Sequence, residues 1–409
     1  MNNKRLLMVV FGLFSLAATA DEYIDPSTNV VYTYNPDSTT AEVKSGIVIG
    51  WEKMPEYVAG SPNVSGDVVI LEKIKSNGKE FSVTKIGDYA FCMLDDLIHV
   101  SVPSSVRTIG VEAFAGCSRL VSIDMKEGLR EICRESFRGC ISLKSISLPS
   151  GLMTIGSEAF SGCQELTSIN IPANVSEMHV LSFWNCNSLG AITVEEGNSI
   201  YDSRYNCNAV IRTADNMLLM GCKNTVIPNT INAIGKQAFL SCKGLTEIVI
   251  PESVREIGES AFSNCSNLRI LTLSEGLQVI DRSAFWMCGL TAVTIPASVR
   301  EIEPGAFWMS ELTSLTSLIE EPFEMNMICN LDAYQTTLYV PAGAIEKYRA
   351  TPDWDQFTEI QEVNTNKIGT VPSASDNFSE TLFNLQGHRL SAKPQKGLYI
   401  QNGRKMVVR

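Results

Sequence analysis

The stretch that decides the fold reads Ile155-Gly-Ser-Glu-Ala-Phe160-Ser-Gly-Cys163 and continues as Gln-Glu-Leu166-Thr-Ser-Ile-Asn-Ile-Pro172. Variants of this phrase recur along the chain, and their phenylalanine returns every 23 residues, with one interruption and a last step that is one residue short. The series consists of Phe91, Phe114, Phe137, Phe160, Phe183, Phe239, Phe262, Phe285 and Phe307. Such a period is typical of a solenoid, whose units stack because none can bury its apolar face alone.

Each repeat is expected to form one short strand and one tight turn. In the segment Ser168-Ile169-Asn170-Ile171, polar and apolar residues alternate, which places the isoleucines inward and the polar side chains outward. Proline at position 172 ends the strand because it cannot donate to a ladder. Residues 157–160 are too few for more than one turn of α or 3₁₀ helix. The pattern therefore predicts a strand-dominated, α/β-type repeat solenoid.

The repeats also set the expected organisation of the chain. Its segments are a signal peptide (1–20), a β-rich N-terminal cap (21–82), repeats one to five (83–194), a hairpin insertion (195–228), repeats six to nine (229–318), a C-terminal cap (319–363), a linker (364–378) and a small C-terminal β module (379–409). Solenoids need caps because their end units would otherwise expose the core. Asn402-Gly403, between two apolar runs, predicts a hairpin in the last segment.

The first twenty residues have the three parts of a secretory signal peptide. Lys4 and Arg5 precede a short apolar run, and Ala18-Thr-Ala20 supplies the small residues of a cleavage site. The alternative, a membrane anchor, is disfavoured because the run is too short to span a bilayer, and no later segment is long and apolar enough to do so. We therefore expect an exported protein, at the cell surface or outside the cell, cleaved near Ala20.

The net charge of −12 argues against a nucleic-acid partner, which requires a basic patch. Signature motifs for nucleotide binding, serine hydrolysis and zinc proteolysis are absent from the sequence. The three histidines, at positions 99, 179 and 388, belong to separate units, so a shared catalytic site is not expected. The sequence predicts no enzyme activity, no catalytic residues, no cofactor and no metal site.

Most cysteines follow the repeat, three residues after its phenylalanine. They are Cys117, Cys140, Cys163, Cys186, Cys242, Cys265 and Cys288. A thiol at such a position is a small apolar side chain suited to a tight inner corner, so we expect a ladder of free, buried cysteines. Disulfide staples, the usual role of many cysteines in an exported chain, are the alternative.

One other pair of cysteines lies in the insertion. Residues 209–211 and 218–220 are apolar runs that predict a hairpin around Ala214-Asp215. A two-residue loop at that place would set Cys207 opposite Cys222, so this pair is a candidate disulfide.

The consensus L-x-x-I-x-I-P-x-x-V-x-x-I-G-x-x-A-F-x-x-C resembles the 23-residue leucine-rich repeat of the BspA type, over about residues 83–318. Proteins of that family are bacterial surface proteins, common in Bacteroidetes and treponemes. The segments Phe383-Asn-Leu-Gln-Gly-His-Arg389 and Lys396-Gly-Leu-Tyr-Ile400 are similar to carboxy-terminal sorting modules of Bacteroidetes. The resemblance implies surface display and adhesion to host or bacterial macromolecules, without a binding motif that could be placed on particular residues.

The outward strand positions form a candidate ligand-binding face. They align in rows across the repeats, one of which consists of Ser101, Asp124, Ser147, Asn170, Thr193, Val249, Thr272 and Thr294. A second row, two residues earlier in each strand, begins with His99 and Ser122 and includes Ser168 and Ala191. Stacked strands would make a shallow hydrogen-bonding sheet of roughly nine rungs, suited to an extended ligand. The alternative is that small polar residues merely solvate the sheet.

A second candidate site is apolar. The residue after the repeat phenylalanine is usually small or polar, but the last two repeats place Trp286-Met287 and Trp308-Met309 there. Trp184 occupies the same position in repeat five. Neighbouring rungs would bring Trp286 beside Trp308 on the convex edge, as an adaptable contact surface. The alternative is that cap residues such as Phe323 or Met325 cover this pair and the insertion covers Trp184.

These observations predict an exported repeat protein without enzyme activity that binds an extracellular protein or glycan. A structural surface spacer without a defined ligand is the alternative, and a hydrolase with unfamiliar residues is the least favoured one. The ligand and the oligomeric state are left open by the sequence.

Overall fold

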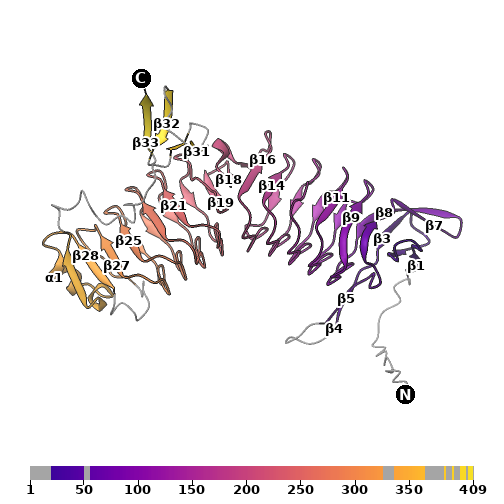
Figure 1. The fold of residues 1–409 in the computed structure, drawn as a ribbon, viewed down its shortest axis with the longest axis horizontal. Helices are drawn as coiled ribbons and strands as arrows, with labels where there is room; N and C mark the ends of the chain where they lie inside the picture. The colour runs from indigo at the N-terminus through magenta and orange to yellow at the C-terminus, as the bar shows by residue number, and fades with distance from the viewer. Residues whose placement is uncertain are drawn as a thin grey trace, which may run out of the picture.

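The computed structural model describes residues 20–49, 56–325 and 336–363, together with four short strands between residues 382 and 408. Residues 1–19 of the expected signal peptide and the whole expected linker lie outside the described residues. The repeats stack one on another into an elongated solenoid, as Figure 1 shows. It is built almost entirely of strands and turns, as the repeat pattern predicted.

One side of the solenoid carries the longer strands, which come from the apolar alternation of each repeat. They are β9 (Leu97–Val102), β11 (Ser122–Met125), β14 (Ser168–Ile171), β16 (Ala191–Val194), β21 (Glu247–Ile250), β23 (Ile270–Leu273), β25 (Ala292–Ile295) and β27 (Ser314–Ser317). Neighbouring strands within each sheet pair in parallel. In β9 and β11 the paired residues are one repeat apart, so that Ser101 lies opposite Asp124. Inward residues such as Ile123 and Ile169 are buried.

A second side carries two-residue strands centred on the repeat isoleucine. They are β10 (Thr108–Ile109), β12 (Glu131–Ile132), β13 (Thr154–Ile155), β15 (Glu177–Met178), β20 (Ala233–Ile234), β22 (Glu256–Ile257), β24 (Val279–Ile280) and β26 (Glu301–Ile302). They pair in parallel from rung to rung on either side of the insertion. This second ladder closes each rung opposite the longer strands.

The third side, here called the turn ladder, consists of the tight turns around the repeat phenylalanines. In each regular rung, alternate backbone amides donate to carbonyls of the next rung: Glu135 N to Ser157 O, Phe137 N to Ala159 O, and Gly139 N to Ser161 O, at 2.9, 2.7 and 2.7 Å. The phenylalanine rings stack behind these turns, with about 5 Å between neighbouring centroids from Phe91 to Phe183 and again from Phe239 to Phe307. Consecutive turns, without a helix, make up this side.

The repeat cysteines lie beside the rings as free thiols, in agreement with the expected ladder. Six of them are buried, and Cys242 is half-buried. The thiols of the six buried cysteines donate to the phenylalanine carbonyl of the preceding rung, as from Cys163 Sγ to Phe137 O at 3.3 Å. Ser310 takes the cysteine position in the last rung and donates to Phe285 O at 3.1 Å. The ladder is therefore held by hydrogen bonds as well as by packing.

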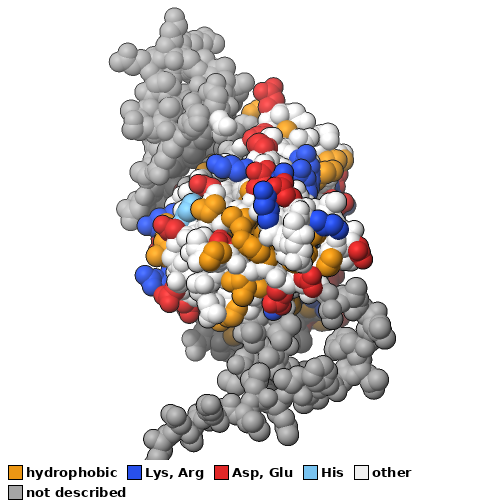
Figure 2. Space-filling model, turned by 90° about the vertical axis from the view of Figure 1, so that its right-hand side faces the viewer, with side chains coloured by type: hydrophobic (Ala, Val, Ile, Leu, Met, Phe, Trp, Pro, Cys, Tyr) orange, Lys and Arg blue, Asp and Glu red, His pale blue; other side chains and the backbone are white. Residues whose placement is uncertain are grey.

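The N-terminal cap joins the repeats directly. Its strands are β1 (Asp21–Ile24), β2 (Val31–Tyr34), β3 (Thr40–Val43), β4 (Ile47–Ile49), β5 (Glu56–Val58), β6 (Gly66–Val69), β7 (Lys73–Ser76) and β8 (Lys79–Ile86). Strands β1, β2 and β3 form an antiparallel meander, and β3 pairs in parallel with β8. Strands β8 and β6 pair in parallel with β10 and β9 of the first repeat. Seen end-on, this end has charged side chains of both signs around a smaller hydrophobic area (Figure 2).

The C-terminal cap continues the sheet of longer strands before ending it. Strands β28 (Thr337–Val340) and β29 (Glu359–Glu362) add to β27 in parallel. Between them lie α1 (Ile345–Ala350) and the 3₁₀ turn η3 (Trp354–Gln356). Trp354, Phe357 and Ile360 are buried in the core, as expected of residues that cover a last rung. The four strands of the C-terminal module, β30 (Leu382–Phe383), β31 (Arg389–Leu390), β32 (Gly397–Gln401) and β33 (Arg404–Val408), pair antiparallel.

The insertion contains β17 (Tyr201–Asp202), the 3₁₀ turn η1 (Arg204–Asn206), and a hairpin of β18 (Ala209–Arg212) and β19 (Met217–Gly221). The candidate disulfide in it is wrong for this structure, because Cys207 and Cys222 are free. A β-bulge between Val210 and Ile211 shifts the pairing by one residue, so that Ala209 lies opposite Gly221. Cys222 is thereby level with Asn208, and its thiol donates to the Asn208 carbonyl at 3.3 Å.

Candidate ligand-binding surfaces

The predicted row of outward strand residues lies on the face of the longer strands. Asn170 is opposite Thr193, Val249 opposite Thr272, and Thr294 opposite Thr316. All residues of the row, from Ser101 to Thr294, are exposed or half-buried in the structure. The row is therefore accessible to a ligand on the outside of the sheet.

The face is longer than the sequence suggested, because both caps contribute to it. In β6, Asp67 lies opposite His99 and Val69 lies opposite Ser101. At the other end, Tyr339 of β28 follows Thr316, and Gln361 of β29 follows Tyr339. The apolar run at residues 68–71 and the strand end at residues 338–341 were the sequence signals for these rungs. We call the whole surface, from β6 to β29, the sheet face.

The sheet face is not one continuous ladder. Its strands form separate sheets, β6-β9-β11, β14-β16, β21-β23 and β25-β27-β28-β29. Residues 145–148, which include Ser147, form no strand. The inter-rung hydrogen bonds on either side of this gap are long, 3.4 Å from Lys144 N to Val121 O and 3.3 Å from Thr167 N to Lys144 O. The structure therefore does not contain the expected uninterrupted sheet of nine rungs. One of its breaks lies at residues 145–148, where the hydrogen bonds between neighbouring rungs are long.

Three polar side chains meet near the N-terminal end of the sheet face. His99 Nδ1 lies 2.8 Å from Ser122 Oγ, and His99 Nε2 lies 3.7 Å from Asp124 Oδ2. The sequence did not predict this cluster, although the offset of 23 residues between His99 and Ser122 was its signal. The distance from His99 Nε2 to Asp124 Oδ2 is longer than that of a hydrogen bond, and the Asp124 side chain is 64% exposed. The geometry suits recognition of a polar ligand better than activation of the serine hydroxyl, which needs an oriented and desolvated base.

A second polar group spans the rungs of β14 and β16. Thr193 Oγ1 donates to Asn170 Oδ1 at 2.8 Å, and Asn170 Nδ2 donates to Glu195 Oε1 at 2.9 Å. These bonds fix the Asn170 amide, because its oxygen accepts from one neighbour while its nitrogen donates to another. Preorganised groups of this kind lose little conformational freedom when a ligand binds.

The tryptophan and methionine pairs lie on the turn ladder, where neighbouring rungs bring them together. Met287 N donates to Trp308 O at 2.9 Å. Trp308 and Met309 are 39% and 49% exposed, whereas Trp286 and Met287 are half-buried. Met325 is buried and Phe323 half-buried, yet they leave Trp308 and Met309 exposed. We call Trp286, Met287, Trp308 and Met309 the apolar patch.

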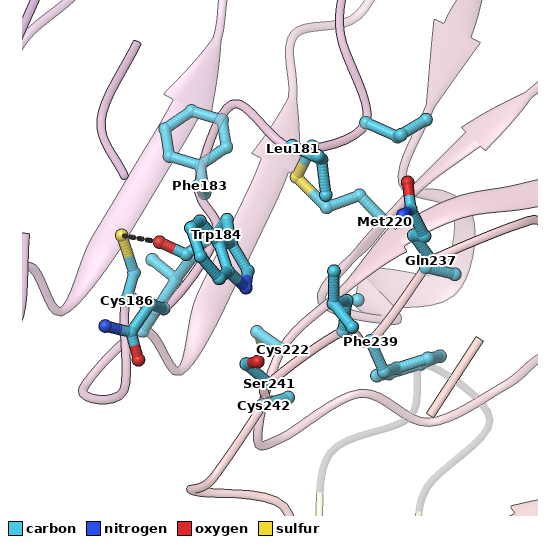
Figure 3. A pocket seen from close by; sticks show the side chains of 16 residues that line it. Leu181, Phe183, Trp184, Cys186, Met220, Cys222, Gln237, Phe239, Ser241 and Cys242 are labelled. Atoms are coloured by element: carbon cyan, nitrogen blue, oxygen red, sulfur yellow. Dashed lines mark hydrogen bonds between the residues drawn. The ribbon is translucent and has the colours of Figure 1, made fainter. Parts of the chain in front are cut away.

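A small cavity of about 30 Å³ lies on the turn ladder where the insertion interrupts the repeats (Figure 3). Phe183 and Phe239 lie on either side of it, and Met220 and Trp184 also line it. Gly221 N donates to Ala238 O at 2.9 Å, the bond that a phenylalanine amide makes in regular rungs. A Cβ on Gly221 would lie 2.0 Å from the Phe239 ring. The insertion therefore adds a rung that has Gly221 in place of the repeat phenylalanine. The cavity left by the missing ring is large enough for water but not for a larger ligand.

Two further classes of site receive no support from the described part of the chain. Within it, no group of three or more His, Cys, Asp or Glu side chains is placed to hold a metal ion. None of the helices described there has the length and apolar character needed to cross a bilayer.

Solved structures of bacterial repeat proteins have the same architecture. The pneumococcal vaccine antigen PcpA is 18% identical and has a TM-score of 0.56, with 84% of this chain and 98% of PcpA covered. A leucine-rich cell surface protein from Faecalibacterium prausnitzii is 21% identical with a TM-score of 0.46, covering 85% of this chain and 96% of that one. At such identities the likeness to PcpA shows the fold alone. No curated protein matches the sequence.

The repeats themselves match a family model. Six copies of the BspA type leucine-rich repeat region match residues 84–211 and 215–319. These ranges cover more than half of the chain and include every repeat phenylalanine. The chain therefore belongs to the BspA-type leucine-rich-repeat family.

Proposed function

We propose that this protein is exported to the cell surface and binds an extracellular macromolecule, a protein or a glycan, along the sheet face. The family is one of bacterial surface proteins, and the Faecalibacterium protein is called a cell surface protein. The signal-peptide pattern of residues 1–20 supports export. No enzyme activity is proposed, since family and fold are those of repeat proteins.

The observation that carries the proposal is the accessible row of hydroxyl and amide side chains. These groups both donate and accept hydrogen bonds, and they recur at the same place on successive rungs. Cross-rung bonds, as at His99 and Asn170, hold several of them in place. An extended ligand could bond to several rungs at once, and many weak contacts would then sum to useful affinity. The chain's net charge of −12 favours a partner without a strong negative charge.

Substitution of Ser168 by arginine should weaken binding at the sheet face. Ser168 is exposed in β14, and a long charged side chain would block the neighbouring rung without entering the core. The matched control is Ser176→Arg, because Ser176 is also an exposed serine and lies just before β15 on another side of the solenoid. Arrays of immobilised host proteins and glycans, followed by titration of each hit, measure the effect. We expect saturable binding that is at least about tenfold weaker in Ser168→Arg and unchanged in Ser176→Arg.

Two results would contradict this proposal. Absence of saturable binding to any arrayed protein or glycan would favour a structural spacer. Equal binding by both arginine variants would place the ligand elsewhere on the molecule.

We also propose that the C-terminal module directs surface delivery. It resembles a sorting module, and its four strands form one small antiparallel sheet. Deletion of residues 379–409 should leave the solenoid folded, because the module follows the C-terminal cap in the chain and supplies no rung. The truncated protein should then remain in the periplasm, as measured by protease shaving and surface immunolabelling. Unchanged surface exposure of the truncated protein would mean that the module carries no sorting signal.

A further inference from the structure

Neighbouring rungs of the regular repeats are joined by backbone hydrogen bonds on all three sides of the solenoid. Between rungs four and five, β14 pairs with β16 on the sheet face, and β13 pairs with β15 on the second side. Any bending at such an interface would lengthen the hydrogen bonds of at least one side and so weaken them. Examples from the three sides are Gly190 N to Thr167 O at 2.9 Å, His179 N to Ile155 O at 3.3 Å, and Phe160 N to Ser182 O at 2.8 Å.

The interface between rung five and the insertion lacks this continuity. On the second side, one sheet ends at β15 and the next begins at β17, while on the sheet face β16 pairs with β14 and with no strand of the insertion. Residues 177–228 are all described, and one backbone hydrogen bond joins residues 177–194 to residues 201–228. It runs from Lys223 N to Leu189 O and is long, at 3.4 Å. The backbone ladders of all three sides are therefore interrupted at the same interface.

Side chains supply most of the hydrogen bonds across this interface instead. Their rotamers can change when the two surfaces shift slightly, which paired backbones cannot do without losing their register. The bonds are Val194 N to Ser203 Oγ at 2.9 Å, Asn224 Nδ2 to Gly190 O at 3.1 Å, and Tyr201 OH to Ser176 O at 3.4 Å. On its other side, the insertion is bonded in the regular way, because β19 pairs in parallel with β20 of rung six.

The hydrophobic core is divided at the insertion as well. Alternate residues of the hairpin face opposite ways, so that Val210 and Met220 pack into the core of the N-terminal repeats. Ile211 and Leu218 pack into the separate core of the C-terminal repeats. The cavity of about 30 Å³ in Figure 3 lies at the same place along the solenoid. Packing between the two runs of repeats is therefore also less continuous here than between regular rungs.

We propose that the interface between rung five and the insertion is a hinge. Around it, the N-terminal arm (residues 83–194) and the C-terminal arm (residues 201–318) bend relative to each other. Bending at this interface strains one backbone hydrogen bond, whereas bending at a regular interface strains those of three sides. The sheet face crosses the hinge, so bending changes its curvature. A ligand that contacts both arms would hold the hinge at one angle, a consequence that rests on the proposed function.

The sequence offers a variant without the hinge. Phe183 and Phe239 are 56 residues apart, which is 33 more than the 23-residue period. Deletion of the 33 residues 195–227 joins Val194 to Pro228. The junction then reads Leu189-Gly-Ala-Ile-Thr-Val194-Pro228-Asn-Thr-Ile231-Asn-Ala-Ile234-Gly235, which has the apolar residues, proline and glycine of the repeat consensus in their places. The variant should therefore stack rung six directly on rung five.

Double electron–electron resonance between two spin labels tests the hinge. The labels are attached to ketone-bearing unnatural amino acids, because the chain contains free cysteines. Labels at Glu131 and Glu256 span the hinge, and labels at Lys85 and Glu177 lie on the second side within one continuous sheet, four strands apart. We expect the distance distribution of the first pair to be about twice as wide as that of the second. After the deletion, Glu131 and Glu256 are also four strands apart, so both pairs should give narrow distributions near roughly 20 Å between strands, apart from the label linkers.

Equal widths for the two pairs in the full chain would overturn the hinge, whether or not the deletion variant folds. A broad distribution that persists in a folded deletion variant, with folding checked by circular dichroism, would also contradict it. Any ligand obtained from the arrays should narrow the distribution between Glu131 and Glu256. If no ligand is found, the proposed function fails, while the comparison of the two label pairs still decides whether the hinge exists.

Discussion

Substitution of Phe160 by alanine is expected to lower the free energy of unfolding by about 3–5 kcal/mol. The Phe160 ring is fully buried and lies between the rings of Phe137 and Phe183, with 5.2 Å between centroids on each side. Its removal would leave a cavity that the neighbouring rungs cannot close, because their backbones are fixed by the turn ladder. Urea denaturation followed by circular dichroism measures the change.

Two substitutions bracket this result. Phe183→Ala should cost less than Phe160→Ala, because Phe183 stacks on a described ring on one side alone and already borders the cavity at the insertion. Trp184→Ser should change stability little, since Trp184 is 37% exposed. A loss below about 1 kcal/mol for Phe160→Ala would contradict its place in the core.

The repeat could be predicted from the sequence because the same physical demand recurs in every rung. Phe160, Cys163 and Ile169 are all buried, at the positions that the 23-residue period assigned to the core. The outward row was predictable for the same reason, since alternation fixes which side chains face the solvent. Repetition also fixed the register, because each strand pairs with its equivalent one period later.

Features that occur once in the chain were not predictable in this way. The bulge at Val210 and Ile211 shifts the strand register, so that Cys222 no longer lies opposite Cys207. No local residue pattern in the sequence indicates this bulge. The contact between His99 and Ser122 depends on side-chain rotamers, which alternation does not determine.

The cysteine ladder leads to the second large effect, a steep loss of stability at alkaline pH. Burial raises the pKa of the Cys117, Cys186 and Cys288 thiols to about 12. It raises the pKa of the Cys140, Cys163 and Cys265 thiols well above the usual range. Each thiol also donates to a carbonyl in the core, which the thiolate could not do.

The direction of this pH effect follows from the difference in thiol pKa between the folded and the unfolded chain. An exposed cysteine in the unfolded chain ionises near pH 8.5, at roughly its ordinary pKa, whereas the buried thiol stays protonated. The stability that these thiols contribute is therefore fully present below about pH 8.5 and is lost as the pH rises towards their folded pKa values. In this window each thiol lowers the free energy of unfolding by about 1.4 kcal/mol per pH unit. The six thiols together therefore lower it by about 8 kcal/mol per pH unit. Since whole domains are stable by about 5–15 kcal/mol, the protein should unfold between about pH 9.5 and 10.5.

Circular dichroism across a pH series, with a phosphine reductant present, measures the alkaline transition. The control variant is Cys163→Ser, because Ser310 shows that a hydroxyl makes the same hydrogen bond at this position of the rung. A serine does not ionise in this range, so each Cys→Ser substitution should make the transition less steep and move its midpoint upwards. In parallel, an aromatic disulfide reagent at pH 8 should label Cys140, Cys163 and Cys265 slowly in the native protein and rapidly in urea, because the thiolate is the reactive form. Rapid native labelling, or an alkaline midpoint that Cys→Ser variants leave unchanged, would show that the thiols are not protonated inside the solenoid.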